Sequence, residues 1–127
     1  MPLPVHFEIA ASDPEKLSAF YRDVFAWEFT KWAGPEDYWL IKTGDKDQPG
    51  IDGGFFKPRG PFVGTVNTLD VDDVDAYLGK IRSHGGQVVV EKHPIPGVGW
   101  NAYCKDPEGT LFGVHQYDPQ AGLGGQA

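Results

Sequence analysis

The sequence contains an internal repeat: its two halves carry the same succession of apolar, polar and turn-forming segments. Corresponding positions are 59 or 60 residues apart, as Leu69 is from Ile9 and Gly113 is from Gly54. Each half has the pattern strand, helix, strand, strand, strand. A pattern that recurs at a fixed spacing indicates two copies of one structural motif. We therefore predict an α+β fold built from two tandem βαβββ modules.

The two modules are predicted over residues 4–57 and 62–117, within a single domain over 1–118. The chain has 127 residues, which is near the commonest size of one domain. The last segment, 119–127, is rich in glycine and is predicted to be a flexible tail.

The first module begins with an alternating segment, Val5–Ile9, whose period of two is typical of a half-buried strand. Asp13 before Pro14 predicts the N-cap and first residue of a helix, and Ser12 with Glu15 is an alternative capping box. Further strands are expected over 28–32, 38–43 and 51–56, with a turn over 34–37. The helix has one apolar stripe predicted to face a core: Leu17, Phe20, Tyr21, Val24 and Phe25.

The fourth segment of this module contains the pair Gly53-Gly54, which indicates a bulge or the close approach of another group. In the second module, a strand over 63–69 leads to a helix capped by Asp72 or Asp73 and ended by Gly85-Gly86. Further strands are expected over 87–90, 100–104 and 111–115, and 93–99 is expected to be a loop.

Alternation along the first strand directs Val5, Phe7 and Ile9 to the helix and places His6 and Glu8 on the opposite face. If both modules do this, their strands form a curved mixed sheet around a concave cup, with the helices outside. A concave, mostly apolar surface with a few polar groups is the usual form of a ligand pocket.

Charge and composition exclude several classes of partner and chemistry. The net charge of −7 argues against a nucleic-acid or anionic-membrane partner, since both require clustered Lys and Arg. The single cysteine, Cys104, rules out an internal disulfide, and the N-terminus lacks the features of a signal peptide, so we expect a cytoplasmic protein. The sequence has neither a Gly-rich phosphate loop nor a Gly-x-Ser-x-Gly motif.

Several motifs resemble those of the vicinal oxygen chelate superfamily, which includes glyoxalase I, bleomycin-resistance proteins and extradiol dioxygenases. The first module is similar in its opening strand and in Phe25-Ala26-Trp27-Glu28-Phe29 after the helix. The second is similar in the segments 70–75 and 105–112, of which Asp106-Pro107-Glu108-Gly109 is the most specific. The resemblance covers about Val5 to Gln116. It implies the fold, and it also implies a homodimer.

Metal enzymes of this superfamily place one ligand on the first and last strand of each module. By this resemblance His6 matches one position, whereas the other three fall at Val66, Gly54 and Gly113, which offer no side-chain ligand. A divalent metal requires about three such ligands, so we expect no metal cofactor. The alternative is a displaced site of His6, Glu8 and His115 for zinc, nickel, iron or manganese.

The function predicted from these features is binding of a small, partly aromatic organic ligand in the cup, without the usual family metal. The alternative is a metal-dependent lyase, isomerase or dioxygenase that uses His6 as a ligand. His6 and Glu8 are also the candidates for acid–base catalysis if the protein is an enzyme. The residues predicted to bind the ligand are His6, Glu8, Trp39, Phe56, Trp100 and His115.

Overall fold

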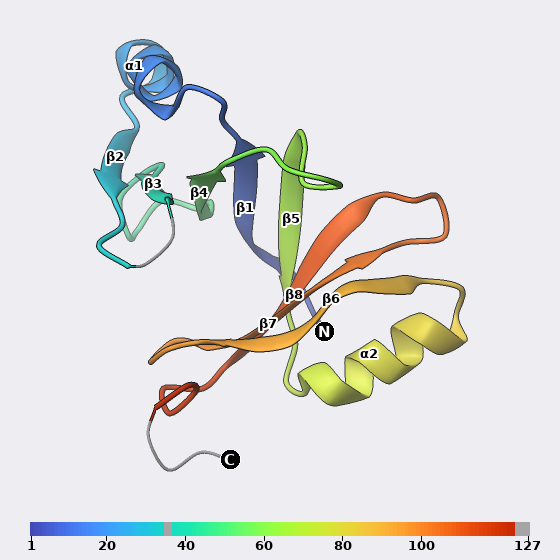
Figure 1. Cartoon of the computed structure of the whole chain (residues 1–127). Helices are drawn as coiled ribbons and strands as arrows, with labels where there is room; N and C mark the ends of the chain where they lie inside the picture. The colour runs from blue at the N-terminus through green and yellow to red at the C-terminus, as the bar shows by residue number, and fades with distance from the viewer. Residues whose placement is uncertain (35–36, 124–127) are drawn as a thin grey trace. The chain divides into compact units, whose positions relative to one another are not determined.

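The computed structural model describes residues 1–34 and 37–123. The chain divides into two compact units (Figure 1). One unit is Val5–Val66, and the other combines Met1–Pro4 with Asn67–Ala127.

The described residues of the Val5–Val66 unit form one helix and four strands, which hydrogen-bond in the order β2-β3-β4-β1. Strand β1 runs parallel to β4, and the other neighbours are antiparallel. The sheet is therefore mixed, as predicted. The elements in chain order are β1 (Pro4–Ala10), α1 (Pro14–Phe25), β2 (Glu28–Lys31), β3 (Trp39–Lys42) and β4 (Asp52–Phe56).

The second unit has the same arrangement, in the order β5-β8-β7-β6 with β5 parallel to β8. Its register also repeats, since Glu8 pairs with Gly54 in the first unit and Thr68 pairs with Gly113 in the second. The predicted βαβββ repeat is thereby confirmed. The elements are β5 (Thr65–Asp70), α2 (Val74–Ser83), β6 (Gln87–Ile95), β7 (Gly99–Lys105) and β8 (Leu111–Tyr117).

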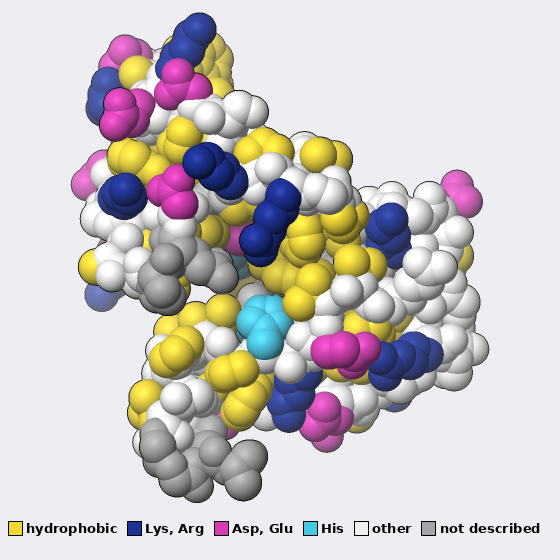
Figure 2. All heavy atoms as spheres, in the orientation of Figure 1, with side chains coloured by type: hydrophobic (Ala, Val, Ile, Leu, Met, Phe, Trp, Pro, Cys, Tyr) yellow, Lys and Arg dark blue, Asp and Glu magenta, His cyan; other side chains and the backbone are white. Residues whose placement is uncertain are grey.

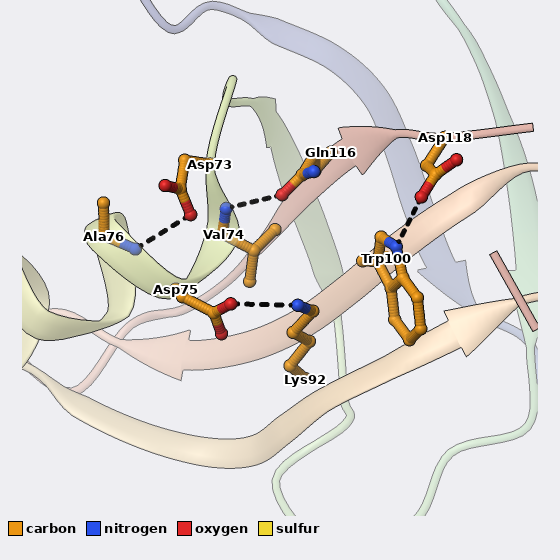
Figure 3. A network of polar contacts seen from close by, with 8 residues as sticks. All are labelled: Asp73, Val74, Asp75, Ala76, Lys92, Trp100, Gln116 and Asp118. Atoms are coloured by element: carbon orange, nitrogen blue, oxygen red, sulfur yellow. Dashed lines mark hydrogen bonds and ion pairs between the residues drawn. The ribbon is translucent and has the colours of Figure 1, made fainter. Parts of the chain in front are cut away.

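Both helices begin at aspartate caps. The structure thereby selects Asp13 over Ser12 for α1 and Asp73 over Asp72 for α2. The Asp13 carboxylate accepts a hydrogen bond from the Lys16 amide at 3.1 Å, with Pro14 as the first helical residue. Asp73 caps α2, accepting from the Ala76 amide at 3.2 Å (Figure 3). These bonds satisfy amides that have no partner within the helix.

Each helix packs on one face of the sheet in its own unit. In the second unit the buried cluster includes Val74 and Leu78 of α2 with Ala102, Cys104 and Val114 of the strands. In the first unit Leu17 and Tyr21 of α1 pack with Phe7, Ile9, Ile41 and Phe55.

The predicted core stripe of α1 is only partly correct. Phe20, Val24 and Phe25 are 53%, 57% and 57% exposed. Ser18 is buried instead, and its hydroxyl donates to the Glu15 carbonyl at 2.9 Å. Leu17, Ser18 and Tyr21 lie on one side of the helix, and Phe20 and Val24 lie a fraction of a turn away from it. The buried side is therefore rotated from the centre of the apolar stripe, and Phe25 is exposed at the last residue of the helix.

Strand β6 is longer than the sequence predicts, because it continues to Ile95 through residues expected to form a loop. His93 pairs with Asn101 and Pro94 pairs with Trp100, after register shifts that indicate bulges. Pro94 is tolerated because β6 is the last strand of its unit, so the amide that proline lacks is not needed for a further neighbour.

The segment predicted to be a flexible tail begins with ordered turns. Ala121 is fully buried, and its carbonyl accepts a hydrogen bond from the Gly97 amide at 2.9 Å. Residues 124–127 of this segment, and the middle of the turn predicted over 34–37, lie outside the described residues. In the described part of the chain, no helix is long and apolar enough to cross a bilayer.

Candidate ligand site

The polar centre of the candidate site is a hydrogen bond between His6 and Tyr38. The His6 Nε2 atom and the Tyr38 hydroxyl are 2.9 Å apart, and both side chains are partly buried. His6 projects from β1 on the face opposite α1, because its neighbours Phe7 and Ile9 belong to the core cluster. Tyr38 immediately precedes β3 and approaches the same face.

Gly54 makes room for this hydrogen bond. A Cβ atom at Gly54 would overlap with the hydroxyl and ring carbon of Tyr38. The neighbouring Gly53 is close to Phe7 in the same way, on the helix side. The close approach predicted from the glycine pair is therefore confirmed, and the group that approaches Gly54 is Tyr38.

The His6 imidazole favours its neutral form. Burial lowers the pKa of His6, and the charges of Glu8 and Asp52 oppose this effect without cancelling it. A neutral imidazole has one nitrogen that donates and one that accepts. The pair of His6 and Tyr38 is therefore a neutral pair of hydrogen-bonding groups.

An open depression of about 390 Å³ lies beside His6 on this face. Its walls combine apolar groups with charges of both signs. Two carboxylates and one ammonium group are present, so the lining does not favour a strongly anionic ligand. The lining residues are His6, Glu28, Thr30, Leu40, Ile41, Lys42, Asp52 and Gly53.

Two further predicted site residues share the face of His6. Glu8 is 7% exposed and is paired in register with Gly54, directly beside the Tyr38 hydroxyl. Phe56 follows Gly54 by two residues and packs edge-on against Phe62, with ring centres 5.9 Å apart. The structure therefore brings His6, Glu8 and Phe56 to one surface of the Val5–Val66 unit.

The two tryptophans predicted to bind the ligand lie on the helix side of their sheets. Trp39 packs with the cluster beneath α1. Trp100 packs with the cluster beneath α2, where its indole nitrogen donates to Asp118 at 3.0 Å and the Lys92 ammonium lies 4.7 Å from its ring centre (Figure 3). Alternation within each strand places both rings on the helix side of the sheet. They therefore point away from the opposite face, here called the open face, on which His6 lies.

His115 lies in the second unit, on the open face of β8. Its Nδ1 atom is hydrogen-bonded to the Asn101 side chain. Its neighbour Gly113 is in contact range of Thr68 and Tyr103, and the Tyr103 ring stacks on His93. His115 thus belongs to a different unit from His6 and Glu8, and the displaced metal set is not assembled within either unit alone.

Three of the four residues at the family's ligand positions have no side chain that could bind a metal. His6 offers a nitrogen, but that nitrogen is already bonded to Tyr38. Val66, Gly54 and Gly113 offer no donor side chain. Within residues 1–34 and 37–123, no three His, Cys, Asp or Glu side chains group together as a metal site requires.

Sequence reasoning did not nominate Tyr38 as a site residue. The signal available was Gly54, whose missing side chain indicated a close neighbour without identifying it. Trp32 also extends the open face, since its ring packs edge-on against the Tyr38 ring with the ring centres 6.2 Å apart.

The surface drawn in Figure 2 shows acidic and basic side chains interspersed with apolar ones.

Comparison with curated proteins found relatives that are longer than this chain. "Putative glyoxylase CFP32" of Mycobacterium tuberculosis is 34% identical over 119 residues, which cover 89% of this chain and 43% of the relative. The anthracycline biosynthesis protein DnrV of Streptomyces peucetius is 27% identical over 128 residues, covering 87% and 46%. The chain thus spans less than half the length of these relatives.

Solved structures share the fold at low identity. Methylmalonyl-CoA epimerase from Mycobacterium tuberculosis superposes with a TM-score of 0.68 at 16% identity, covering 91% of this chain and 88% of the epimerase. A superfamily member from Vibrio splendidus gives a TM-score of 0.64 at 16% identity, covering 93% and 100%. At this identity the likeness concerns the fold alone.

The family itself is established from the sequence. The model of the Glyoxalase/Bleomycin resistance protein/Dioxygenase superfamily matches residues 4–114, which run from the start of β1 into β8. The chain therefore belongs to the Glyoxalase/Bleomycin resistance protein/Dioxygenase superfamily.

Proposed function

We propose that this protein binds a small, partly aromatic organic molecule on the open sheet face around His6, without a metal ion. The observation that carries the proposal is the hydrogen bond of His6 Nε2 to Tyr38 above Gly54. His6 Nε2 has a partner within the protein, and Gly54, at the position where the family usually has a carboxylate, has no side chain. Organic ligands remain the best match to the surface.

The surroundings of the pair support an aromatic ligand. Tyr38, Trp32 and Phe56 present rings on or beside the face that also carries the depression of about 390 Å³, although none of the three lines it. Its volume falls within the range of about 300–1,000 Å³ that is usual for pockets of small organic ligands. The relative DnrV is named for anthracycline biosynthesis, and anthracyclines are fused-ring aromatic compounds. We also propose that the second module contributes to binding the ligand, as in the predicted cup.

The test combines elemental analysis with dye binding. Protein purified without chelator is expected to contain no stoichiometric zinc, nickel, iron or manganese. It is also expected to bind the neutral dye Nile red and to release it when small aromatic compounds are added. Stoichiometric metal that disappears in a His6→Ala variant would contradict the proposal and would favour the metal-dependent lyase, isomerase or dioxygenase.

The proposal also includes a homodimer in the cytoplasm. Three large apolar side chains of α1 are more than half exposed: Phe20, Val24 and Phe25. Exposed apolar patches commonly mark interaction surfaces. One chain has a mass of 14.0 kDa, and light scattering after size exclusion is expected to give twice that mass. A mass of one chain at micromolar concentration would remove the dimer from the proposal.

A further inference from the structure

The solvent-exposed side of α1 carries a stripe in which an apolar centre is flanked by opposite charges. Lys16 precedes Phe20 by four residues and Asp23 follows it by three, so the three residues lie on one side of the helix. We propose that this stripe is the contact surface for a second copy of this chain, with the two α1 helices antiparallel and Phe20 at the two-fold axis. This inference rests on the proposed homodimer and names its interface.

The apolar centre of the stripe is large and is held rigidly. Phe20 and Val24 are both more than half exposed, and their spacing of four residues places them beside each other. The Phe20 ring packs edge-on against Tyr21 with ring centres 5.1 Å apart, and Tyr21 stacks on Trp27 at 4.8 Å. A side chain that is already fixed loses little conformational freedom when a partner covers it.

The charges at the two ends of the stripe are complementary under a two-fold rotation. In an isologous pair, a contact from one residue to another is repeated in the reverse direction. Along the helix axis, Lys16 lies about 6 Å before Phe20 and Asp23 lies about 4.5 Å after it. In an antiparallel pair centred on Phe20, each Lys16 therefore faces the partner's Asp23, and the interface contains two such ion pairs.

Contacts within the chain leave both charges able to form these pairs. Among residues 1–34 and 37–123, the Lys16 ammonium makes no ion pair. Asp23 pairs with its neighbour Arg22 at 3.4 Å, where both side chains are mostly exposed. An exposed pair of this kind contributes little free energy, so Asp23 can turn to a partner at small cost. A surface that complements itself in this way favours a second copy over an unrelated partner.

Charge reversal tests the pairing without weakening the helix. Lys16→Glu places an acidic side chain in the first turn of α1, and Asp23→Lys places a basic one in the last turn, as the helix dipole favours. Each single variant sets like charges opposite each other at both pairs. We expect each to raise the dissociation constant of the dimer about tenfold.

The double variant Lys16→Glu/Asp23→Lys restores opposite charges and keeps the net charge of −7. Its dissociation constant is expected to return to within about twofold of the wild-type value, because the two substitutions are coupled. The matched control is Arg22→Glu, which makes the same charge change as Lys16→Glu but lies about 200° around the helix from Phe20. It is expected to leave the dimer unchanged.

Phe20→Gln removes the apolar centre from both copies at once and keeps a good helix former at this position. It is expected to be monomeric at concentrations where the wild-type protein is a dimer. Analytical ultracentrifugation over a concentration series measures the dissociation constants, and circular dichroism establishes that each variant is folded.

Loss of the dimer in the single reversals, with recovery in the double variant, supports the interface. A dimer that is unaffected by Phe20→Gln would overturn the α1 interface and leave the homodimer intact. A double variant as weak as the single reversals would overturn the antiparallel pairing. A wild-type protein that stays monomeric would overturn both this interface and the proposed homodimer, and would assign the stripe to a different partner.

Discussion

The protonation of His6 links the open face to stability. In an unfolded chain a histidine titrates near about 6.5, whereas burial lowers the pKa of His6 in the folded protein. The unfolded chain therefore binds the proton first. The neutral imidazole contributes its full stability above about pH 6.5, and this contribution is lost as the pH falls towards the folded-state pKa.

We therefore expect wild-type protein to lose more stability between pH 8 and pH 5 than a His6→Gln variant does. Urea unfolding of both proteins at the two pH values measures the difference, and the other titrating groups cancel in the comparison. A wild-type protein that gains stability relative to the variant on acidification would contradict the neutral imidazole.

Cys104 is predicted to be an inert thiol. Its side chain is fully buried, and burial raises the pKa of the thiol to about 11. The thiolate, which is the reactive species, is therefore scarce at neutral pH and inaccessible. A disulfide reagent such as dithionitrobenzoate is expected to react within seconds in denaturant and many times more slowly with folded protein. Equal rates in both conditions would show that the thiol is accessible.

Individual site residues were predictable to the extent that strand alternation determines them. The face shared by His6 and Glu8 followed from the pattern of β1, since Phe7 and Ile9 are apolar. Trp39 was nominated because it follows a loop, whereas in the structure its ring packs against the core cluster beneath α1. Tyr38, one residue earlier, has the opposite direction and reaches His6.

The start of each helix depends on one aspartate. Asp73 caps α2, and the Gln116 side chain accepts from the Val74 amide at 2.9 Å as a second partner of the same turn (Figure 3). Asp73→Ala is expected to cost about 1 kcal/mol of unfolding free energy, as is Asp13→Ala in α1. The matched control is Asp72→Ala, next to the cap, with an expected effect below about 0.5 kcal/mol.

Denaturant unfolding of the three variants measures these differences. An effect of Asp72→Ala as large as that of Asp73→Ala would contradict the assignment of the cap. The sequence left Asp72 and Asp73 as alternatives because both precede the apolar stripe of α2. The choice depends on backbone conformation, which is extended at Asp73.

Secondary structure was predictable where local patterns agree with packing. Strand β6 is longer than predicted because Pro94 and Pro96 disfavour a strand in the local sequence. At the edge of the sheet, pairing with β7 is still possible and extends the strand to Ile95. The sequence correctly predicted helix α1 and its N-cap, but it did not predict which side of the helix is buried. That direction depends on where the sheet lies, and the helix sequence alone does not specify it.

The repeat made the fold of each half predictable before any side-chain contact was known. A spacing of 59 or 60 residues gave both modules, and the paired registers of Glu8 with Gly54 and of Thr68 with Gly113 reproduce that spacing. The contents of the two open faces differ, however, because the modules share their pattern and not their residues. Position 66 is valine where position 6 is histidine.

Whether the modules behave as one domain is a question of cooperativity. Each compact unit contains roughly half of the chain. A segment of about 60 residues buries a smaller fraction of its surface than a larger domain does, and is correspondingly marginal alone. We therefore expect the single domain predicted over 1–118 to unfold in one transition, with neither unit persisting after the other has unfolded.

Two probes placed in different units test this expectation in the wild-type protein. Three of the four tryptophans, Trp27, Trp32 and Trp39, lie in the Val5–Val66 unit, whereas Cys104 lies in the other. The urea midpoint from tryptophan fluorescence should coincide with the midpoint at which the Cys104 thiol becomes reactive. Two separated midpoints would mean that the units unfold independently, and the chain would then count as two small domains. Coincident midpoints would show that burial within one half depends on the folding of the other.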